Sequence, residues 1–186
     1  MGAHLISIVT FLAVMGDNLD TVRSCGVKAV FSSLCVLGFD ASVDDVEHAF
    51  GETPLKGSVS LADIQRAAES LKMHTVLVRL RVPDELVLGS ILHFKADEGH
   101  FVTFLGFEGE DIVVVDAPMP PLRYNRHLFL EQWSGNALFV FRSQLEKEAY
   151  QHDVLTNRVR YFLCFAWIGM FLCVWLLSLL RSRRCS

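Results

Sequence analysis

Apolar residues recur at helical spacing through the first half of the chain. Between residues 25 and 38 they fall three and four positions apart, on one face of a helix, at Val27, Val30, Phe31 and Leu34. Gly38 predicts the end of this helix. Either Ser24 or Thr21 is suited to cap its start.

Two further helices are predicted, each after a serine. Ser42 and Asp45 form a capping-box pattern that opens a short helix ending at Phe50. Ser60 caps the next helix, whose apolar stripe consists of Leu61, Ile64, Ala68 and Leu71. The first half of the chain is therefore expected to be helical.

The second half changes to the spacing of strands. Short apolar runs separated by turn residues predict strands at Thr75–Leu80, Ser90–Phe94, His100–Phe107, Asp111–Val115 and Asn136–Phe141. The prolines between Asp116 and Pro121 must lie outside the sheet, and Leu128–Trp133 reads as a helical turn. Helices followed by antiparallel strands predict an α+β fold over residues 16–142.

Both ends of the chain depart from this globular pattern. Residues 1–15 contain an uncharged apolar run that is consistent with a signal-like segment or with a segment packed on the domain. Residues 143–160 are polar and are expected to form a stalk. Residues 161–180 carry no charge, which predicts a single transmembrane helix, and the basic tail 181–186 favours a cytosolic C-terminus. Arg158 and Arg160 on the other flank leave the side of the membrane open.

Charge and cysteine content narrow the functional classes. The formal net charge of -4 argues against nucleic-acid binding. The 5 cysteines include no CxxC pair, so a metal centre or a redox motif is not expected. Cys25 and Cys35 belong to the globular part, and a disulfide framework there is not expected.

Cys25 is the candidate nucleophile. It begins the first predicted helix, where the positive end of the helix dipole favours the thiolate over the thiol. Cys35 lies more than two turns further along the same helix and is read as a core residue. A small buried residue is the alternative reading for Cys25.

His100 and Asp116 are the candidate partners of that thiol. A hairpin turn centred near Glu108 and Gly109 places His100 opposite residue 116 or 117, at one rim of the sheet. A carboxylate beside an imidazole fixes its tautomer and stabilises its charged form. Cysteine, histidine and carboxylate together are the parts of a cysteine peptidase, which needs no metal or cofactor. His93, in the middle of its strand, is expected to pack rather than react.

These residues resemble the bacteriocin-processing peptidase domain over roughly residues 15–142. The resemblance is carried by Ser24-Cys25-Gly26, Ile91-Leu92-His93-Phe94, Gly99-His100-Phe101-Val102, Val114-Val115-Asp116-Ala117-Pro118 and Trp133-Ser134-Gly135. That domain is papain-like, removes leader peptides after a double glycine and is usually fused to an export ABC transporter. The resemblance implies Cys25 as nucleophile, His100 as general base and acid, and Asp116 as the residue that orients His100.

Two departures from the family pattern affect what is expected. Leu19 stands where the family has a glutamine that helps to bind the oxyanion, and Asn18 is the neighbouring amide that offers a replacement. The phosphate-binding loop of an ATPase is also missing from the chain. The expectation is therefore a stand-alone, membrane-anchored enzyme that acts on leader peptides, with an ABC transporter as a possible partner in trans. The alternatives are a degenerate peptide-docking module and, more weakly, a membrane-bound amidase or transglutaminase-like enzyme.

Overall fold

The computed structural model describes residues 24–51, 59–95 and 99–156, together with Trp167 and Met170. The chain divides into two compact units, Met1–Gln144 and Leu145–Ser186. The first unit contains the helices α3 (Cys25–Leu37), α4 (Val43–Phe50), α6 (Leu61–Ser70) and α7 (Arg126–Gln132), and the short 3-10 helix η1 (Pro83–Glu85). Its strands are β1 (His74–Arg79), β2 (Ile91–Phe94), β3 (His100–Glu108), β4 (Asp111–Val115), β5 (Leu122–Tyr124) and β6 (Trp133–Phe141).

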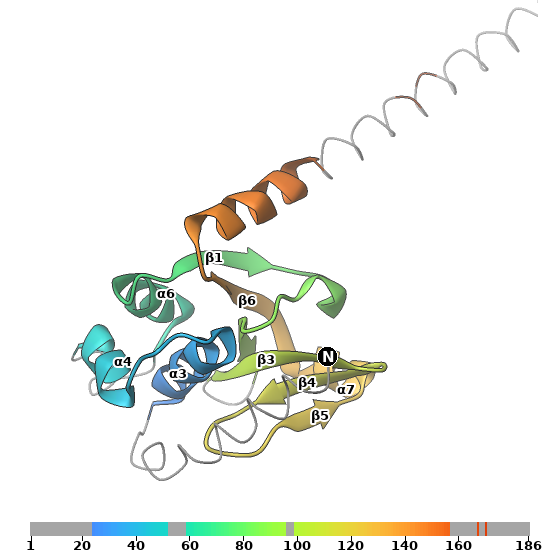
Figure 1. Ribbon diagram of the computed structural model, residues 1–186. Helices are drawn as coiled ribbons and strands as arrows, with labels where there is room; N and C mark the ends of the chain where they lie inside the picture. The colour runs from blue at the N-terminus through green and yellow to red at the C-terminus, as the bar shows by residue number, and fades with distance from the viewer. Residues whose placement is uncertain (1–23, 52–58, 96–98, 157–166, 168–169, 171–186) are drawn as a thin grey trace, which may run out of the picture. The chain divides into compact units, whose positions relative to one another are not determined.

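Three helices gather on one side of a single antiparallel sheet. The strands lie in the order β1-β6-β2-β3-β4-β5, and Figure 1 shows α3, α4 and α6 side by side, with α3 next to β3. The predicted α+β class, with helices first and an antiparallel sheet second, is confirmed by this arrangement.

The predicted starts and ends of the helices are largely correct. Ser42 and Ser60 both form complete capping boxes, with Asp45 and Asp63 as the reciprocal partners. Gly38 ends α3 in the left-handed conformation, with a φ of 74°. The capping prediction for Ser24 is wrong, because its side chain accepts no capping hydrogen bond. Thr21, the alternative, lies outside the described residues.

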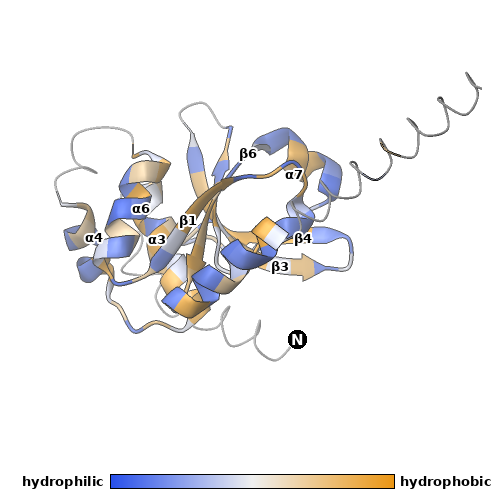
Figure 2. Cartoon of the chain, turned by 90° about the horizontal axis from the view of Figure 1, so that it is seen from above, coloured by the Kyte–Doolittle hydropathy of each residue, from blue (hydrophilic) through white to orange (hydrophobic). Residues whose placement is uncertain are grey.

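The hydropathy of the helices explains where each of them packs. In Figure 2 the ribbons of α4 and α6 alternate between hydrophilic and hydrophobic stretches, as expected for surface helices. Helix α3, by contrast, buries most of its residues, because α4 and α6 cover one side of it and the sheet covers another. Cys25 is therefore carried on the central helix of the domain.

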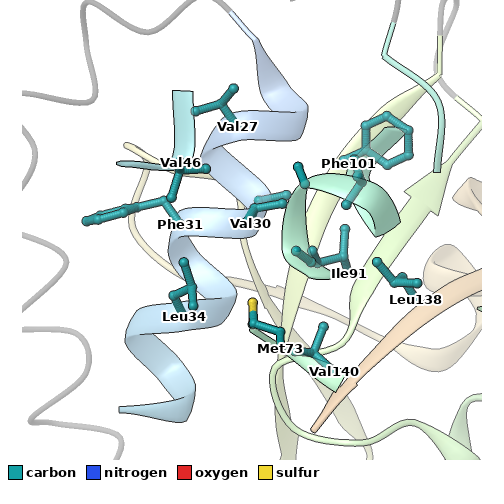
Figure 3. Close-up of a cluster of buried hydrophobic side chains, with 14 of the residues drawn as sticks. Val27, Val30, Phe31, Leu34, Val46, Met73, Ile91, Phe101, Leu138 and Val140 are labelled. Atoms are coloured by element: carbon teal, nitrogen blue, oxygen red, sulfur yellow. The ribbon is translucent and has the colours of Figure 1, made fainter. Parts of the chain in front are cut away.

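The main core lies between α3 and the sheet. Figure 3 shows Val30 on α3 directed toward Ile91 on the sheet, whereas the ring of Phe31 points the opposite way, beside Val46 of α4. The four stripe residues share one buried cluster with the strand residues Ile91, Phe101, Leu138 and Val140. Burial of such side chains stabilises a domain by roughly 1.5–3 kcal/mol each before the entropy cost. The predicted apolar stripe of the first helix is confirmed as the core face.

The strand predictions differ from the structure at the ends of the sheet. Strand β6 begins at Trp133, three residues earlier than predicted, so Trp133 belongs to the sheet and not to the predicted helical turn. Strand β5 was not predicted, because three residues between Pro121 and Asn125 are too few to show an alternating pattern. It extends the sheet beside β4, in the register Ile112↔Tyr124.

The second unit is described only in part. Its residues 145–156 are helical, and Trp167 and Met170 are helical and exposed. Among the described residues, no helix has the length and apolar character needed to cross a membrane. The segments 1–15 and 181–186 lie outside the described residues, as do most of 161–180, the end of the 143–160 stalk and Asn18 and Leu19.

Candidate active site

Cys25 and His100 are brought together by the contact between α3 and β3. Cys25 is the first residue of α3, and His100 is the first residue of β3. The hydroxyl of Thr103 on β3 donates a buried hydrogen bond to the carbonyl oxygen of Ala29 on α3, at 3.0 Å. This bond lies one helical turn from Cys25 and three residues from His100, so it fixes the two elements close to the site.

A second buried hydrogen bond anchors α3 further along. The hydroxyl of Ser33 donates to the carbonyl oxygen of Gly89 at 2.6 Å, just before β2 begins. Gly89 in turn donates its N–H to Phe104 of β3 at 2.9 Å. Helix α3 is thus held to the sheet by two polar contacts as well as by the apolar core.

His100 and Asp116 are in direct contact. Nε2 of His100 lies 2.8 Å from Oδ2 of Asp116, and both side chains are about one-third exposed, at 33% and 32%. The expected proximity of these two residues is confirmed. Their partial exposure at the rim of the sheet makes both side chains accessible to solvent.

The register that led to this expectation was wrong. The hairpin turn is centred on Gly109 and Glu110, one residue later than predicted, because Glu108 pairs with Asp111. An irregularity between Phe104 and Gly106 shifts the pairing again, and the last pair is Thr103↔Val115. His100 therefore reaches Asp116 diagonally, beyond the end of the paired residues.

The Cys25 thiol meets the imidazole from the other side. Burial by itself disfavours the thiolate, but hydrogen bonds from the His100 side chain and from the backbone N–H of Phe101, with the charge of His100, outweigh it and lower the pKa of Cys25. Because Nε2 of His100 is occupied by Asp116, Nδ1 is the ring nitrogen left to face the sulfur.

The charge state of His100 follows from the same two partners. Hydrogen bonds to the Asp116 carboxylate and to Cys25 raise the pKa of His100 to about 10, although burial opposes the charge. The raised pKa of His100 and the lowered pKa of Cys25 together favour a thiolate–imidazolium pair with a carboxylate behind it. Such a pair is the resting form that a nucleophilic cysteine requires.

Cys35 has none of these partners. It is half-buried beside apolar residues of the core, including Val36, Leu105 and Val113. Burial raises the pKa of its thiol to about 11. The assignment of Cys35 to the core is therefore confirmed.

Two residues near the site were not singled out from the sequence. Burial raises the pKa of the Tyr124 phenol on β5, and the negative charge of Asp116 adds to this effect. Thr103 was not identified because a threonine in a strand gives no signal of a contact with a helix.

Among the described residues there is no group of three histidine, cysteine or acidic side chains suited to hold a metal ion.

Comparisons with known structures show the same fold. The peptidase domain of Streptococcus ComA, described as a bifunctional ABC transporter, matches with a TM-score of 0.57 and 19% identity, over 65% of this chain and 93% of that one. A double-glycine-motif protease from an AMS/PCAT transporter, solved with its leader peptide, matches with a TM-score of 0.54 and 20% identity, over 64% and 84%.

A third solved structure and the family comparison agree with these. The peptidase C39-like domain of a toxin secretion ATP-binding protein from Vibrio parahaemolyticus matches with a TM-score of 0.53 and 18% identity, over 66% of this chain and 100% of that one. No curated protein matches the chain. The model of the Peptidase C39 family matches residues 20–144, which include Cys25, His100 and Asp116, and the chain therefore belongs to the Peptidase C39 family of cysteine peptidases.

Proposed function

We propose that this peptidase cleaves the leader peptides of small exported peptides after a double glycine, with Cys25, His100 and Asp116 as its reacting groups. The observation that carries the proposal is the contact of one imidazole with both a thiol and a carboxylate. A solved relative in fold that holds a leader peptide supports the choice of substrate class.

The first chemical step forms a thioester. The Cys25 thiolate attacks the carbonyl carbon of the scissile peptide bond, and a tetrahedral oxyanion forms. The imidazolium of His100 then gives its proton to the nitrogen of the leaving amine, and the C–N bond breaks. Asp116 holds Nε2 of the imidazole, so that the other ring nitrogen stays directed at the reacting atoms.

The second step releases the leader. Neutral His100 takes a proton from water, the resulting hydroxide attacks the thioester carbonyl, and the Cys25 sulfur leaves as a thiolate. The protonated imidazole then faces the thiolate again, which restores the resting pair. Protons and charges balance over the two steps without a cofactor.

The oxyanion needs hydrogen-bond donors in both steps. Backbone N–H groups at the start of α3 are suited to this role, since the Ser24 side chain does not cap them. We propose the side-chain amide of Asn18 as the second donor, in place of the family glutamine at Leu19. The Asn18→Ala change should lower kcat by ~10-fold or more with little change in KM, whereas Leu19→Gln should preserve or raise kcat.

A peptide-docking module without turnover is the second candidate function. Leu19 favours it, because the loss of one oxyanion donor costs ~10²–10³ in rate. The charged Cys25–His100 pair favours the enzyme, since docking alone requires neither group. Binding of a leader peptide without cleavage by the wild type, together with cleavage by Leu19→Gln, would establish the docking module.

We also propose that residues 161–180 anchor the protein as a single membrane span and that it serves an ABC transporter in trans. The uncharged sequence of this segment and the exposure of Trp167 and Met170 support the anchor. Recovery of the full chain in the soluble fraction would contradict it. Protease protection of a tag after Ser186 tests a cytosolic C-terminus, which digestion from outside would exclude.

The cleavage reaction is tested with the full chain in detergent or vesicles. A synthetic leader peptide that ends in a double glycine and continues into a cargo segment is incubated with the protein, and the fragments are identified by mass. The same peptide with both glycines replaced by valine is the matched substrate control. Cleavage of both peptides alike, or of neither, would contradict the proposed specificity.

A further inference from the structure

His93 is held in one orientation by the irregular start of β6. Its Nδ1 lies 2.9 Å from the hydroxyl oxygen of Ser134, which also accepts the backbone N–H of Asn136 at 3.2 Å. The pairing of β2 with β6 shifts register between Leu92 and Phe94, which is where His93 lies. The centroid of its ring also lies 5.4 Å from the centroid of the Phe101 ring, with the two rings tilted by 48°. The imidazole is therefore held at its Nδ1 edge by Ser134 and packs against the ring of Phe101.

The opposite edge of this imidazole abuts the residue before His100. A Cβ atom built on Gly99 would lie 2.7 Å from Nε2 of His93, closer than side-chain carbons approach other atoms. Gly99 also has a φ of +76°, which favours glycine. The edge of the His93 ring thus fills the space beside the Gly99 backbone that a side chain would need.

We propose that His93 is a positioning residue that braces the Gly99 backbone and thereby holds the His100 imidazole between Cys25 and Asp116. The brace runs from Ser134 on β6 through His93 to Gly99, and His100 follows at once on β3. This inference deepens the proposed function and rests on it for its catalytic consequence. Its effect on the Cys25 thiol does not depend on the substrate.

The chemistry of His93 suits a brace rather than a second proton carrier. Burial lowers the pKa of His93, so the ring is neutral at neutral pH. A neutral ring places no second positive charge beside the His100 imidazolium. Its contact with Ser134 accounts for one ring nitrogen, and its contact with Gly99 places the other against the backbone.

Three substitutions at His93 distinguish the contribution of its Nδ1 edge, which meets Ser134, from that of its Nε2 edge, which faces Gly99. His93→Ala removes both edges, His93→Asn keeps a polar atom near the position of Nδ1, and His93→Gln keeps one near the position of Nε2. We expect His93→Ala to lower kcat by ~10-fold with KM nearly unchanged, because a small displacement of a reacting group is costly. His93→Gln should retain more activity than His93→Asn, because it keeps the edge that meets Gly99.

Gly99→Ala tests the contact from the other side. The added methyl group must displace either the ring or the backbone, so kcat should fall at least as far as in His93→Ala. Gly109→Ala is the matched control, since Gly109 has a φ of +65° and no atom within 4 Å of a built Cβ. In a His93→Ala background, Gly99→Ala should cost less than in the wild type, because the atom that it meets is gone.

The alkylation rate of Cys25 against pH distinguishes positioning from loss of stability and needs no substrate. In folded His93→Ala, the midpoint should move up toward the ordinary range of a thiol, since the His100 contact that lowers it is loosened. A wild-type midpoint in both His93→Ala and Gly99→Ala would overturn the proposal. So would a loss of kcat in Gly109→Ala as large as that in Gly99→Ala.

If the wild type cleaves no leader peptide, the proposed function is refuted. The alkylation of Cys25 would still test the positioning role of His93, because it needs no substrate. If His93→Ala fails to fold, His93→Gln and His93→Asn carry the comparison. Equal kcat values and equal alkylation midpoints for these two variants would then overturn the proposal.

Discussion

The two ends of helix α3 place similar thiols in opposite chemical states. Cys25, at the first residue, is half-buried but lies against His100 and the backbone N–H of Phe101, and its pKa is lowered. Cys35, ten residues later on the same helix, is half-buried among apolar side chains, and its pKa is raised to about 11. Burial acts in the same direction on both thiols, so the partners of the sulfur decide which one is reactive.

Replacement of each thiol is the most severe test of this contrast. Cys25→Ala should abolish cleavage of a leader peptide, with a loss on the order of 10⁴-fold or more, because no nucleophile remains. Cys35→Ala is the matched control on the same helix and should keep the wild-type kcat. Fragment yield by mass spectrometry measures both. Retained cleavage in Cys25→Ala, or its loss in folded Cys35→Ala, would reverse the assignment.

Asp116→Asn should lower the reactivity of Cys25 indirectly, through its effect on the His100 imidazole. The amide can still contact Nε2, but it favours the wrong tautomer and no longer stabilises the imidazolium, so kcat should fall by ~10²–10⁴-fold. Asp111→Asn, at the other end of β4, is the control and should leave kcat unchanged. An Asp116→Asn enzyme with wild-type kcat would show that the 2.8 Å contact with His100 has no catalytic role.

The pH dependence of alkylation compares the two thiols in one molecule. The Cys25 rate should fall only when the pH drops through its lowered pKa, whereas the Cys35 rate should rise only as the pH approaches about 11. At pH 7, four units below that value, the Cys35 thiolate fraction is ~10⁻⁴, and Cys25 should react at least ~100-fold faster. Site-resolved mass spectrometry after pulsed iodoacetamide measures both rates. Equal rates would remove the distinction.

The pKa of His100 sets the upper pH limit for the thiolate–imidazolium pair. Because its folded pKa is raised from 6.5 to about 10, its imidazolium contributes stability that is fully present below 6.5 and is lost as the pH rises through about 10. The thiolate–imidazolium pair therefore occupies the window between the lowered pKa of Cys25 and about pH 10.

The sequence predicted the position of Cys25 at the start of α3 better than the contacts that hold α3 in place. The helix stripe, the capping box at Ser42, the cap at Ser60 and the presence of the hairpin are local patterns, and these predictions were confirmed. The contacts of Thr103 with Ala29 and of His93 with Gly99 join residues that no local period relates. Such contacts depend on how α3 packs and on a strand irregularity, and neither leaves a signal in the spacing of apolar residues.

The error in the hairpin register shows the same limit. The turn lies one position later than predicted, which moves the position opposite Asp116 from His100 to a later residue of β3. The extra residue at the irregularity near Leu105 reverses only part of this shift. The two side chains still meet, because both lie at the rim, where β3 and β4 are no longer paired with each other. The rim could thus be predicted from the sequence, but the pairing could not.

Substitutions of two adjacent serines in the middle of α3 should have the smallest effect, on the free energy of unfolding, and one serine serves as the control for the other. Ser32 and Ser33 are adjacent and both are fully buried, at 0% exposure. The Ser33 hydroxyl donates to Gly89 at 2.6 Å, whereas the Ser32 hydroxyl has no hydrogen-bond partner among the described residues. Ser33→Ala leaves the Gly89 carbonyl oxygen without this donor and should lower the free energy of unfolding by ~1–3 kcal/mol.

Ser32→Ala should leave the free energy of unfolding unchanged or raise it by up to ~1 kcal/mol, because it removes an unpaired buried hydroxyl and favours the helix. Urea denaturation of both variants, with equal m values, gives the difference directly. If both variants lose the same stability, the bond to Gly89 does not anchor α3. If only Ser33→Ala loses stability and also lowers the alkylation rate of Cys25 but not of Cys35, the position of α3 on the sheet is what keeps its first residue against His100.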